Sequence, residues 1–499
     1  MVSRLRLLTL AVGLFYVVVF NTALANDDFN LWLTTLKQQA LAAGISDKTA
    51  TTTINHIELM PNVIKLDLAQ PEFISPFLDY YYQRVDAAKI VRGRLLLAQH
   101  EVLLNQIEAQ YGVPKALLVA FWGMETNYGS QQGNIDTLST LATLAYDGRR
   151  AGFFRNQLLD AMRMIDAGNA SVDKFRGSWA GAFGNMQFMP TTFMTYAVDG
   201  DGDKHIDIVN SAADAFASAA NYLAQVGWHK TEPAMIEVQL PENFQWQNAQ
   251  LNLRKSTEEW TNLGVKALYA TNEYDKNSDE VNQIRKTSNG SKISEKTSEK
   301  ALAKAKISKI QSKNYQSNKT KNRYKNSIGH KKSATKKVVN KKTIKRPYQN
   351  STSNDLIHNP LTNDALVSAS ILSNTSSQAA ILLPQGWRGP AFMVFDNFDA
   401  IMDWNRSVNY ALSVAQLAKR LQGESKIIGG KTAEAGALTF QQMFALQAAL
   451  NKRGFDTGEP DGFPGLQTQA AVRAYQLSQN LPADGYASPS LYNRLQSSP

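Results

Sequence analysis

The sequence predicts a mainly α-helical protein with a minor β component and a small three-helix domain at its C-terminal end. Over residues 27–110 apolar side chains recur three and four positions apart, which is the spacing of one face of a helix. Helical signals continue to Ile165 and return, after a loop, over residues 211–226. One later stretch, residues 234–246, has a strand pattern with flanking turn residues. The 499 residues include no cysteine, so hydrophobic cores must hold the fold without disulfides.

The N-terminal residues 1–25 have the pattern of a secretory signal peptide. Arg4 and Arg6 form a basic start, an apolar run follows to Phe20, and Ala23 and Ala25 fit the small-residue cleavage rule. We therefore expect cleavage after Ala25, and a soluble protein of the bacterial envelope with no stable membrane anchor. The alternative is an uncleaved anchor helix, although the run is short for a span of about 20 residues.

A helix predicted to begin at Pro114 carries one carboxylate, Glu125, near its C-terminal end. Leu118, Phe121 and Trp122 occupy core positions of this helix. The helix dipole and burial both disfavour a negative charge there, so we expect the pKa of Glu125 to be raised. A protonated carboxyl group suits a general acid for cleavage of a glycosidic bond. The alternative is a surface glutamate that ends a helix.

A loop rich in Asp and Gly follows, and it imitates the first nine positions of a calcium loop. Its candidate ligands alternate along the chain: Asp199, Asp201, Asp203, His205 and Asp207. The loop departs from the standard pattern at Lys204, where glycine is usual, and at Asn210, where a bidentate Glu is usual. Asp214 is available to replace that Glu. A structural calcium ion and a metal-free turn loop are therefore both open.

Residues 270–375 are dominated by Lys, Asn, Ser and Thr, and we predict a disordered insert there. Residues 266–350 contain 23 Lys and Arg against 6 Asp and Glu, a net of +17, although the whole chain carries only +10. Such a charge attracts polyanions or peptide carboxylates, and the alternative is a solvated insertion at a loop tip. Regular aromatic residues are missing from it, so we predict no nucleic-acid binding.

Helical and apolar signals return in residues 376–422, and a Gly- and Ala-rich linker, residues 423–437, precedes a compact closing unit, residues 438–499. Within that unit we expect Thr439 to cap a first helix, Gly454 to end it, and Pro489 to open the last helix.

Seven ordered segments resemble the catalytic domain of the membrane-bound lytic murein transglycosylase B family. They are GIS at Gly44 to Ser46, QPE at Gln70 to Glu72, YGVP at Tyr111 to Pro114, METNYG at Met124 to Gly129, SWAGAFGNMQFMPTTF at Ser178 to Phe193, NYLAQVGW at Asn221 to Trp228, and DNFDAIMDWNRSVNYAL at Asp396 to Leu412. The resemblance implies a lysozyme-like fold made of residues 26–269 and 376–422. It also implies cleavage of the MurNAc–GlcNAc β-1,4 bond of peptidoglycan with formation of a 1,6-anhydromuramic acid end.

The closing unit resembles the small three-helix peptidoglycan-binding module, through LQAALNKRGF at Leu446 to Phe455, the DGFPG turn and TQAAVRAYQ at Thr468 to Gln476. The two resemblances imply a monomeric periplasmic enzyme that needs no cofactor. Its partners would be peptidoglycan glycan strands and other cell-wall enzymes. Some family members hold calcium at the position of the Asp-rich loop.

Glu125 matches the family's catalytic Glu, which acts first as an acid and then as a base. The resemblance implies that four further residues line the cleft: Ser178, Gln187, Asn405 and Tyr410. Ser178 is a candidate to hydrogen-bond Glu125, and Tyr410 is a candidate to orient Glu125 or to shape the floor of the cleft. Tyr128 offers a flat face for a sugar ring, and Phe188 does so unless it is packed in the core. Asp136 and Asp147 are candidates for a second carboxylate, but their contexts favour turn or cap roles. A hydrolytic muramidase and a non-catalytic wall-binding protein are the alternatives.

Overall fold

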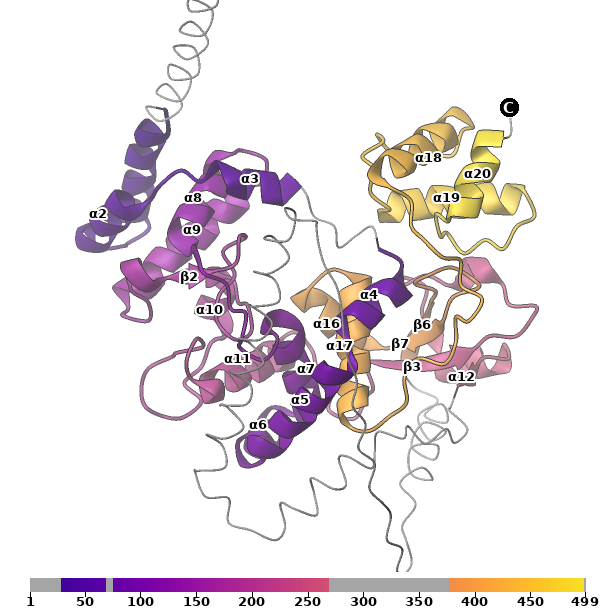
Figure 1. Cartoon of the computed structure of the whole chain (residues 1–499), viewed down its shortest axis with the longest axis horizontal. Coiled ribbons are helices and arrows are strands. Elements are labelled where there is room, and N and C mark those ends of the chain that lie inside the picture. Colours follow the sequence, from indigo (N-terminus) through magenta and orange to yellow (C-terminus); the bar gives the residue numbers. More distant parts are fainter. Residues whose placement is uncertain (1–27, 69–74, 269–376, 498–499) are drawn as a thin grey trace, which may run out of the picture. The chain divides into compact units, whose positions relative to one another are not determined.

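The computed structural model describes residues 28–68, 75–268 and 377–497 (Figure 1). In these ranges the protein is mainly helical with two small sheets, so the predicted fold class is confirmed. The predicted signal peptide and the predicted basic insert lie outside the described residues. No described helix combines the length and the hydropathy that a bilayer-spanning segment needs.

Helix α7 (Lys115–Thr126) is the central helix of the larger region, by which we mean the described residues before residue 423. Residues 116–124 are all buried, as expected for a helix that is apolar on every side. It packs against α5, α6, α11 and α17. Pro114 precedes the first turn, as predicted, and the chain leaves the helix through Asn127 and Tyr128, whose φ angles are 48° and 58°. This left-handed exit ends the helix directly after Glu125 and Thr126.

The other helices of this region pack around α7 or beside it. After a first helix at residues 28–42, they are α2 (Asp47–His56), α3 (Pro61–Leu68), α4 (Phe77–Arg84), α5 (Ala87–Gln99), α6 (Glu101–Tyr111), α8 (Thr137–Tyr146), α9 (Ala151–Asp166), α10 (Pro190–Tyr196), α11 (Ala212–Gln225), α12 (Thr257–Asn262), α16 (Asp396–Trp404) and α17 (Val408–Leu421). Helices α8 and α9 lie side by side and contact α2 (Figure 1). Helix α17 packs along α7 although it comes almost 300 residues later in the chain.

A five-stranded antiparallel sheet joins segments from both sides of residues 269–376. Its order is β4-β6-β7-β3-β5, with strands β3 (Met235–Gln239), β4 (Lys255–Ser256), β5 (Lys266–Ala267), β6 (Gln378–Leu382) and β7 (Ala391–Val394). Met235 pairs with Val394 and Ile381 pairs with Met393. Strand β3 confirms the predicted strand, whereas β6 and β7 were not predicted. Every residue of β7 is buried, so the alternation that identifies a strand is missing from its sequence.

The second sheet has only two short strands, β1 (Ile135–Asp136) and β2 (Arg176–Gly177). Strand β2 leads directly into Ser178, and β1 leads into α8. The pairing therefore fixes the start of the segment that carries the predicted cleft residues.

The closing unit contains α18 (Phe440–Lys452), α19 (Leu466–Ser478) and α20 (Pro489–Ser497) around one apolar core. Thr439 forms a capping box with Gln442, and Gly454 follows the end of α18 with φ 83°, as predicted. Pro489 opens the last helix, as predicted.

The predicted linker, residues 423–437, is attached to the larger region. The backbone N–H groups of Ile428 and Gly429 donate to the half-buried carboxylate of Glu237 on β3, at 3.1 and 2.7 Å. Farther along, the Glu434 carbonyl accepts from Gln385 at 2.9 Å. This segment is therefore held at two points along its length.

Candidate active site

Glu125 is half-buried at the C-terminal end of α7, as the sequence predicts. Its Oε1 accepts hydrogen bonds from the Trp404 Nε1–H at 2.9 Å and from the Tyr410 hydroxyl. Trp404 is the last residue of α16 and Tyr410 lies in the first turn of α17. One carboxylate oxygen is thus oriented by two donors from a different part of the chain.

Trp404 is a site residue that the sequence analysis missed. Its ring lies 4.4 Å from that of Phe121, 5.3 Å from that of Phe188 and 5.1 Å from that of Tyr222, between ring centroids. These contacts fix the indole so that its N–H points at Glu125. The only signal in the sequence was its place directly before Asn405 in a matching segment.

Tyr410 is held equally firmly. It is 5% exposed, and its backbone N–H donates to the Ser407 side chain, which caps α17. Its ring centroid is 6.4 Å from that of Phe121. The structure therefore brings Tyr410 to Glu125, in agreement with the orienting role that the resemblance implies.

Gln187 occupies a tight turn closed by a β-bridge between Phe183 and Phe188. Its φ is 50°, and its Nε2 donates to the carbonyls of Gln132 and Gly184, at 3.0 and 3.2 Å. Its Oε1 has no hydrogen-bond partner among the described residues, and the side chain is half-buried. The turn thus presents a free amide oxygen, which suits a hydroxyl or N-acetyl group of a sugar.

Asn405 follows α16 in an extended conformation. Its Oδ1 accepts from the Ser407 N–H at 3.1 Å, which fixes the amide plane. Within the described ranges its Nδ2 has no acceptor, so Asn405 supplies two free N–H donors. Gln187 therefore offers a hydrogen-bond acceptor to a ligand, and Asn405 offers two hydrogen-bond donors.

Ser178 begins a turn after β2. Its Oγ accepts from the Ala182 N–H at 3.1 Å, and its own N–H donates to the Ala182 carbonyl at 2.7 Å. The hydroxyl proton is free to donate elsewhere, and the predicted hydrogen bond to Glu125 stays a prediction.

Tyr128 does not have the sugar-facing position that we predicted. It is 3% exposed, its hydroxyl donates to the Lys89 carbonyl at 2.8 Å, and its ring packs edge-on against Trp122. A Cβ on Gly123 would lie 2.7 Å from the Tyr128 ring, which shows how closely the ring covers α7. Tyr128 therefore closes the core below the site, and Phe188, at 2% exposed, also belongs to the core.

Asn185 is a second residue to which the sequence analysis gave no role. Its Oδ1 accepts from Trp122 at 2.9 Å, and its Nδ2 donates to the carbonyls of Ile208 and Val209, at 3.2 and 2.9 Å. Its carbonyl accepts from the Thr126 hydroxyl at 2.9 Å. Because it is buried and its polar atoms are engaged, Asn185 joins the end of α7 to the following loops instead of lining a subsite.

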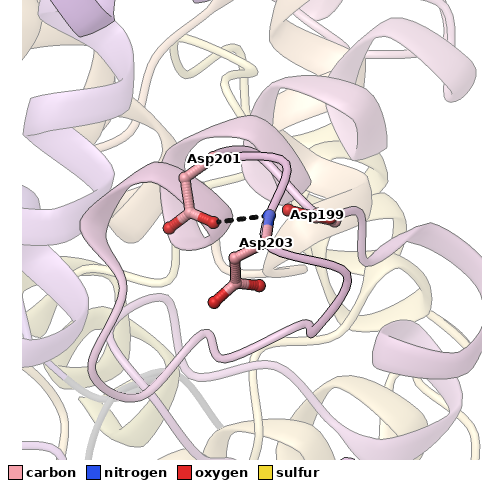
Figure 2. A group of neighbouring side chains, drawn as sticks. All are labelled: Asp199, Asp201 and Asp203. Carbon is pink, nitrogen blue, oxygen red and sulfur yellow. Dashed lines mark hydrogen bonds between the residues drawn. The ribbon is translucent and has the colours of Figure 1, made fainter.

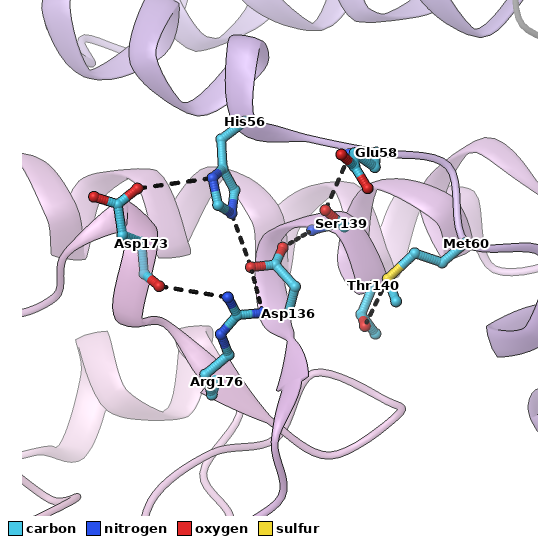
Figure 3. Close-up of polar contacts among 8 residues, drawn as sticks. All are labelled: His56, Glu58, Met60, Asp136, Ser139, Thr140, Asp173 and Arg176. Carbon is cyan, nitrogen blue, oxygen red and sulfur yellow. Dashed lines mark hydrogen bonds and ion pairs between the residues drawn. The ribbon is translucent and has the colours of Figure 1, made fainter.

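The two candidates for a second carboxylate have cap positions, as their contexts predicted. Asp136 is the N-cap of α8, accepts from the Ser139 N–H at 2.8 Å and pairs with His56 at 2.8 Å and Arg176 at 3.3 Å (Figure 3). Burial alone would raise the pKa of Asp136, but the hydrogen bonds from His56 and Ser139 outweigh it and lower that pKa. Asp147 is the C-cap of α8 and pairs with Arg149 at 3.2 Å.

The Asp-rich loop brings together three of its five predicted ligands. Carboxylate oxygens of Asp199, Asp201 and Asp203 lie within 4.8 Å of one another, and all three residues are exposed (Figure 2). His205 and Asp207 are not part of this cluster. His205 donates its backbone N–H to Asp203, and Asp207 caps the next turn.

The departures in that loop have structural consequences. Lys204 makes the left-handed turn, with φ 74°, at the position where glycine is usual. Asn210 donates its amide to Asp207 at 2.8 Å. Asp214, which is buried, accepts from the backbone N–H groups of Gly200 and Asp207, each at 2.7 Å, and so fixes the backbone of the loop. The residues fit a calcium ion through three carboxylates but offer no bidentate group at position twelve.

The transglycosylase SLT domain family matches residues 28–292 and 331–419, and the peptidoglycan binding domain family matches residues 441–495. SltB3 from Pseudomonas aeruginosa, solved in complex with NAG-anhNAM-pentapeptide, is 34% identical with a TM-score of 0.71, over 94% of this chain and 99% of that chain. Membrane-bound lytic murein transglycosylase B from Escherichia coli K12 is 34% identical over 161 residues, which are 32% of this chain and only 44% of that protein.

The Escherichia coli lytic transglycosylase Slt35 in complex with calcium is 20% identical, with a TM-score of 0.52 over 78% of this chain and 92% of that one, and it shares the fold. The family match covers most of the chain, and the similarity to SltB3 covers nearly all of it. The chain therefore belongs to the transglycosylase SLT domain family and carries a peptidoglycan binding domain at its C-terminal end.

Proposed function

We propose that this protein is a lytic transglycosylase that cleaves the MurNAc–GlcNAc β-1,4 bond of peptidoglycan and leaves a 1,6-anhydromuramic acid end. The observation that carries the proposal is the single carboxylate of Glu125, half-buried at a helix end and held by Trp404 and Tyr410. The free amide groups of Gln187 and Asn405 suit a neutral, hydroxyl-rich ligand.

In the proposed reaction Glu125 first gives its proton to the glycosidic oxygen, so the C1–O bond breaks and the GlcNAc end leaves with its hydroxyl restored. The carboxylate then takes the proton of the muramic C6 hydroxyl while that oxygen bonds to C1. Glu125 therefore ends the reaction with its proton restored, and no water is consumed. The raised pKa that the first step needs stays a prediction for Glu125.

The same contacts argue against the hydrolytic alternative. A glycosidase with two carboxylates needs the second one free to act as a nucleophile or to activate water. Asp136 is committed to His56, Arg176 and the cap of α8, and Asp147 pairs with Arg149. Neither carboxylate has the freedom that this second role requires.

We further propose that the mature chain is a monomer in the periplasm, after removal of residues 1–25. It would act on glycan strands beside other cell-wall enzymes, with no required cofactor. We also propose that the domains of the protein end at the limits predicted from the sequence, residues 269, 375, 422 and 437.

We also propose that Asp199, Asp201 and Asp203 hold a structural calcium ion, which would stabilise the loop between α10 and α11 without entering the reaction. A ligand that binds only the folded state at 100 times its Kd stabilises it by about 2.7 kcal/mol. Calcium, and not magnesium, is therefore expected to raise the Tm of the protein, and Asp201→Asn is expected to remove that rise. An equal Tm with and without calcium would refute the site.

The test of the main proposal is digestion of purified sacculi with mass spectrometry of the released muropeptides. We expect fragments lighter by one water than hydrolysis products, and no fragments with Glu125→Gln. Glu101→Gln is the matched control, since Glu101 is an exposed glutamate on α6. Ordinary reducing ends would identify a hydrolase, and unchanged cleavage by Glu125→Gln would exclude Glu125 as the acid.

A further inference from the structure

A cavity of about 300 Å³ lies between the β6–β7 loop and the C-terminal peptidoglycan binding domain. The loop contributes Trp387 and Arg388, the attached linker contributes Glu434, and the domain contributes Asp484, Tyr486 and Arg494. None of these residues belongs to the site around Glu125. The volume is at the lower end of those that bind small ligands.

The walls of this cavity are held together by a buried carboxylate. Asp484 is 8% exposed and accepts from the Trp387 backbone N–H at 2.8 Å, from Gln476 Nε2 at 2.7 Å and from the Tyr486 N–H at 2.9 Å. Gly386 has φ 71°, and a Cβ there would lie 2.9 Å from the Asp484 carboxylate. Contacts within the protein itself therefore fix the walls of the cavity.

The acidic residues of the lining are already engaged. Besides the bonds of Asp484, both carboxylate oxygens of Glu434 accept from Ser490, from its backbone N–H at 2.6 Å and its hydroxyl at 2.8 Å. These contacts use donors of the protein itself, and in the described part of the chain neither carboxylate forms an ion pair with Arg388 or Arg494.

The two arginines of the lining are not paired in this way. Neither Arg388 nor Arg494 has a carboxylate partner in the described part of the chain. The Arg388 guanidinium lies over the Trp387 ring, 4.7 Å from its centroid, and Trp387 is 40% exposed. The cavity thus combines two cations that have spare N–H donors with an accessible aromatic edge.

We propose that this cavity binds the carboxylate groups of a peptidoglycan stem peptide. Guanidinium groups bind carboxylates with two parallel hydrogen bonds, and the indole supplies an apolar surface for the short aliphatic side chains. Neutral sugar rings would leave both cations unpaired. This inference rests on the proposed function, since it assigns to the same substrate a contact outside the catalytic cleft.

The test uses the full chain with Glu125→Gln, so that no turnover occurs. A synthetic, sugar-free L-Ala-D-Glu-L-Lys-D-Ala-D-Ala pentapeptide is titrated by calorimetry, with Trp fluorescence as a second readout. We expect Arg388→Gln and Arg494→Gln each to raise Kd about tenfold, the loss of one charge-assisted contact. Lys431→Gln, an exposed linker cation outside the cavity lining, is the matched control and should leave Kd unchanged.

Chemical controls identify the group that is recognised. The pentapeptide with its carboxylates converted to carboxamides should bind at least tenfold more weakly. Equal binding of that analogue, no binding of the free pentapeptide, or equal binding by the arginine variants would overturn the inference. Tighter binding of the peptide-free anhydro-disaccharide, lost in the same variants, would assign the cavity to the lactyl carboxylate and also overturn it.

Sacculus digestion by the protein with Glu125 intact separates the two proposals. Anhydro products without peptide binding would overturn the cavity assignment alone. Peptide binding at the arginines without anhydro products would overturn the catalytic proposal alone. Arg494→Lys, which keeps the charge and removes the bidentate fork, should give an intermediate Kd and circular dichroism like that of the parent.

Discussion

Replacing Trp404 with Phe is expected to lower kcat by about 10- to 30-fold with little change in KM. The change removes the Nε1–H donor to Glu125 and keeps an aromatic ring against Phe121 and Tyr222. Glu125 gains negative charge as it gives up its proton, and a hydrogen bond to a charged group contributes about 1.5–3 kcal/mol. The lower half of that range applies because Glu125 is only half-buried. At about 1.4 kcal/mol for each factor of ten, this gives the expected loss.

The assay is the release of anhydromuropeptides from sacculi under single-turnover conditions, with Tm measured in parallel. Trp260→Phe is the matched control, since the Trp260 indole also donates one buried hydrogen bond, to the Ala379 carbonyl at 2.8 Å, far from Glu125 in the chain. It should lower Tm and leave kcat unchanged. An unchanged kcat in Trp404→Phe, or equal losses of kcat in both variants, would refute the orienting role of Trp404.

Tyr410→Phe removes the second donor to Glu125 and should lower kcat at least tenfold with a Tm within a few degrees of the parent; full activity would exclude that hydrogen bond from the reaction. Asp136→Asn keeps an N-cap and removes the charge, so at pH 7 we expect a loss of about 1 kcal/mol in unfolding free energy. Because the pKa of folded Asp136 is lowered, this contribution is present above the unfolded pKa and is lost as pH falls through the folded one; a difference from Asp136→Asn that persists at pH 2 would contradict it. Glu237→Ala leaves two backbone N–H groups of the linker without their acceptor and should speed proteolysis within residues 423–437, and an unchanged cleavage rate would show that the attachment is weak.

Features that depend on neighbours in sequence were predictable. Pro114 before α7, Thr439 before α18 and Pro489 at the start of α20 each act within one helical turn, and the structure has all three. The position of Glu125 near a helix end followed from the same local pattern. Its approach to Tyr410 was available only through the resemblance, because 285 residues separate the two.

Features that depend on distant partners were missed or misjudged. Strand β7 is buried on both faces, because Phe392 and Val394 lie in the main hydrophobic core and Ala391 and Met393 lie in a second apolar cluster, so its sequence shows no alternation. Tyr128 was predicted to face a sugar ring. The helices that cover it contribute Gly93 and Gly123, and glycine has no apolar side chain from which the packing of a ring could be predicted. Trp404 had no role predicted from the sequence; it is partly buried against the core, and its N–H reaches Glu125 only where α16 meets α7.

Trp404 and Tyr410 reach Glu125 because α16 is held against the first half of the chain. Asn397, fully buried in the first turn of α16, accepts from the His229 N–H at 2.7 Å and donates to the His229 and Glu232 carbonyls. Pairing of β7 with β3 fixes the residues just before it. Since these contacts lie beyond both ends of residues 269–376, the register of β7 and the bonds of Asn397 decide where Trp404 lies. This explains how a long, highly charged segment can enter the sequence between Glu125 and the two residues that donate hydrogen bonds to it.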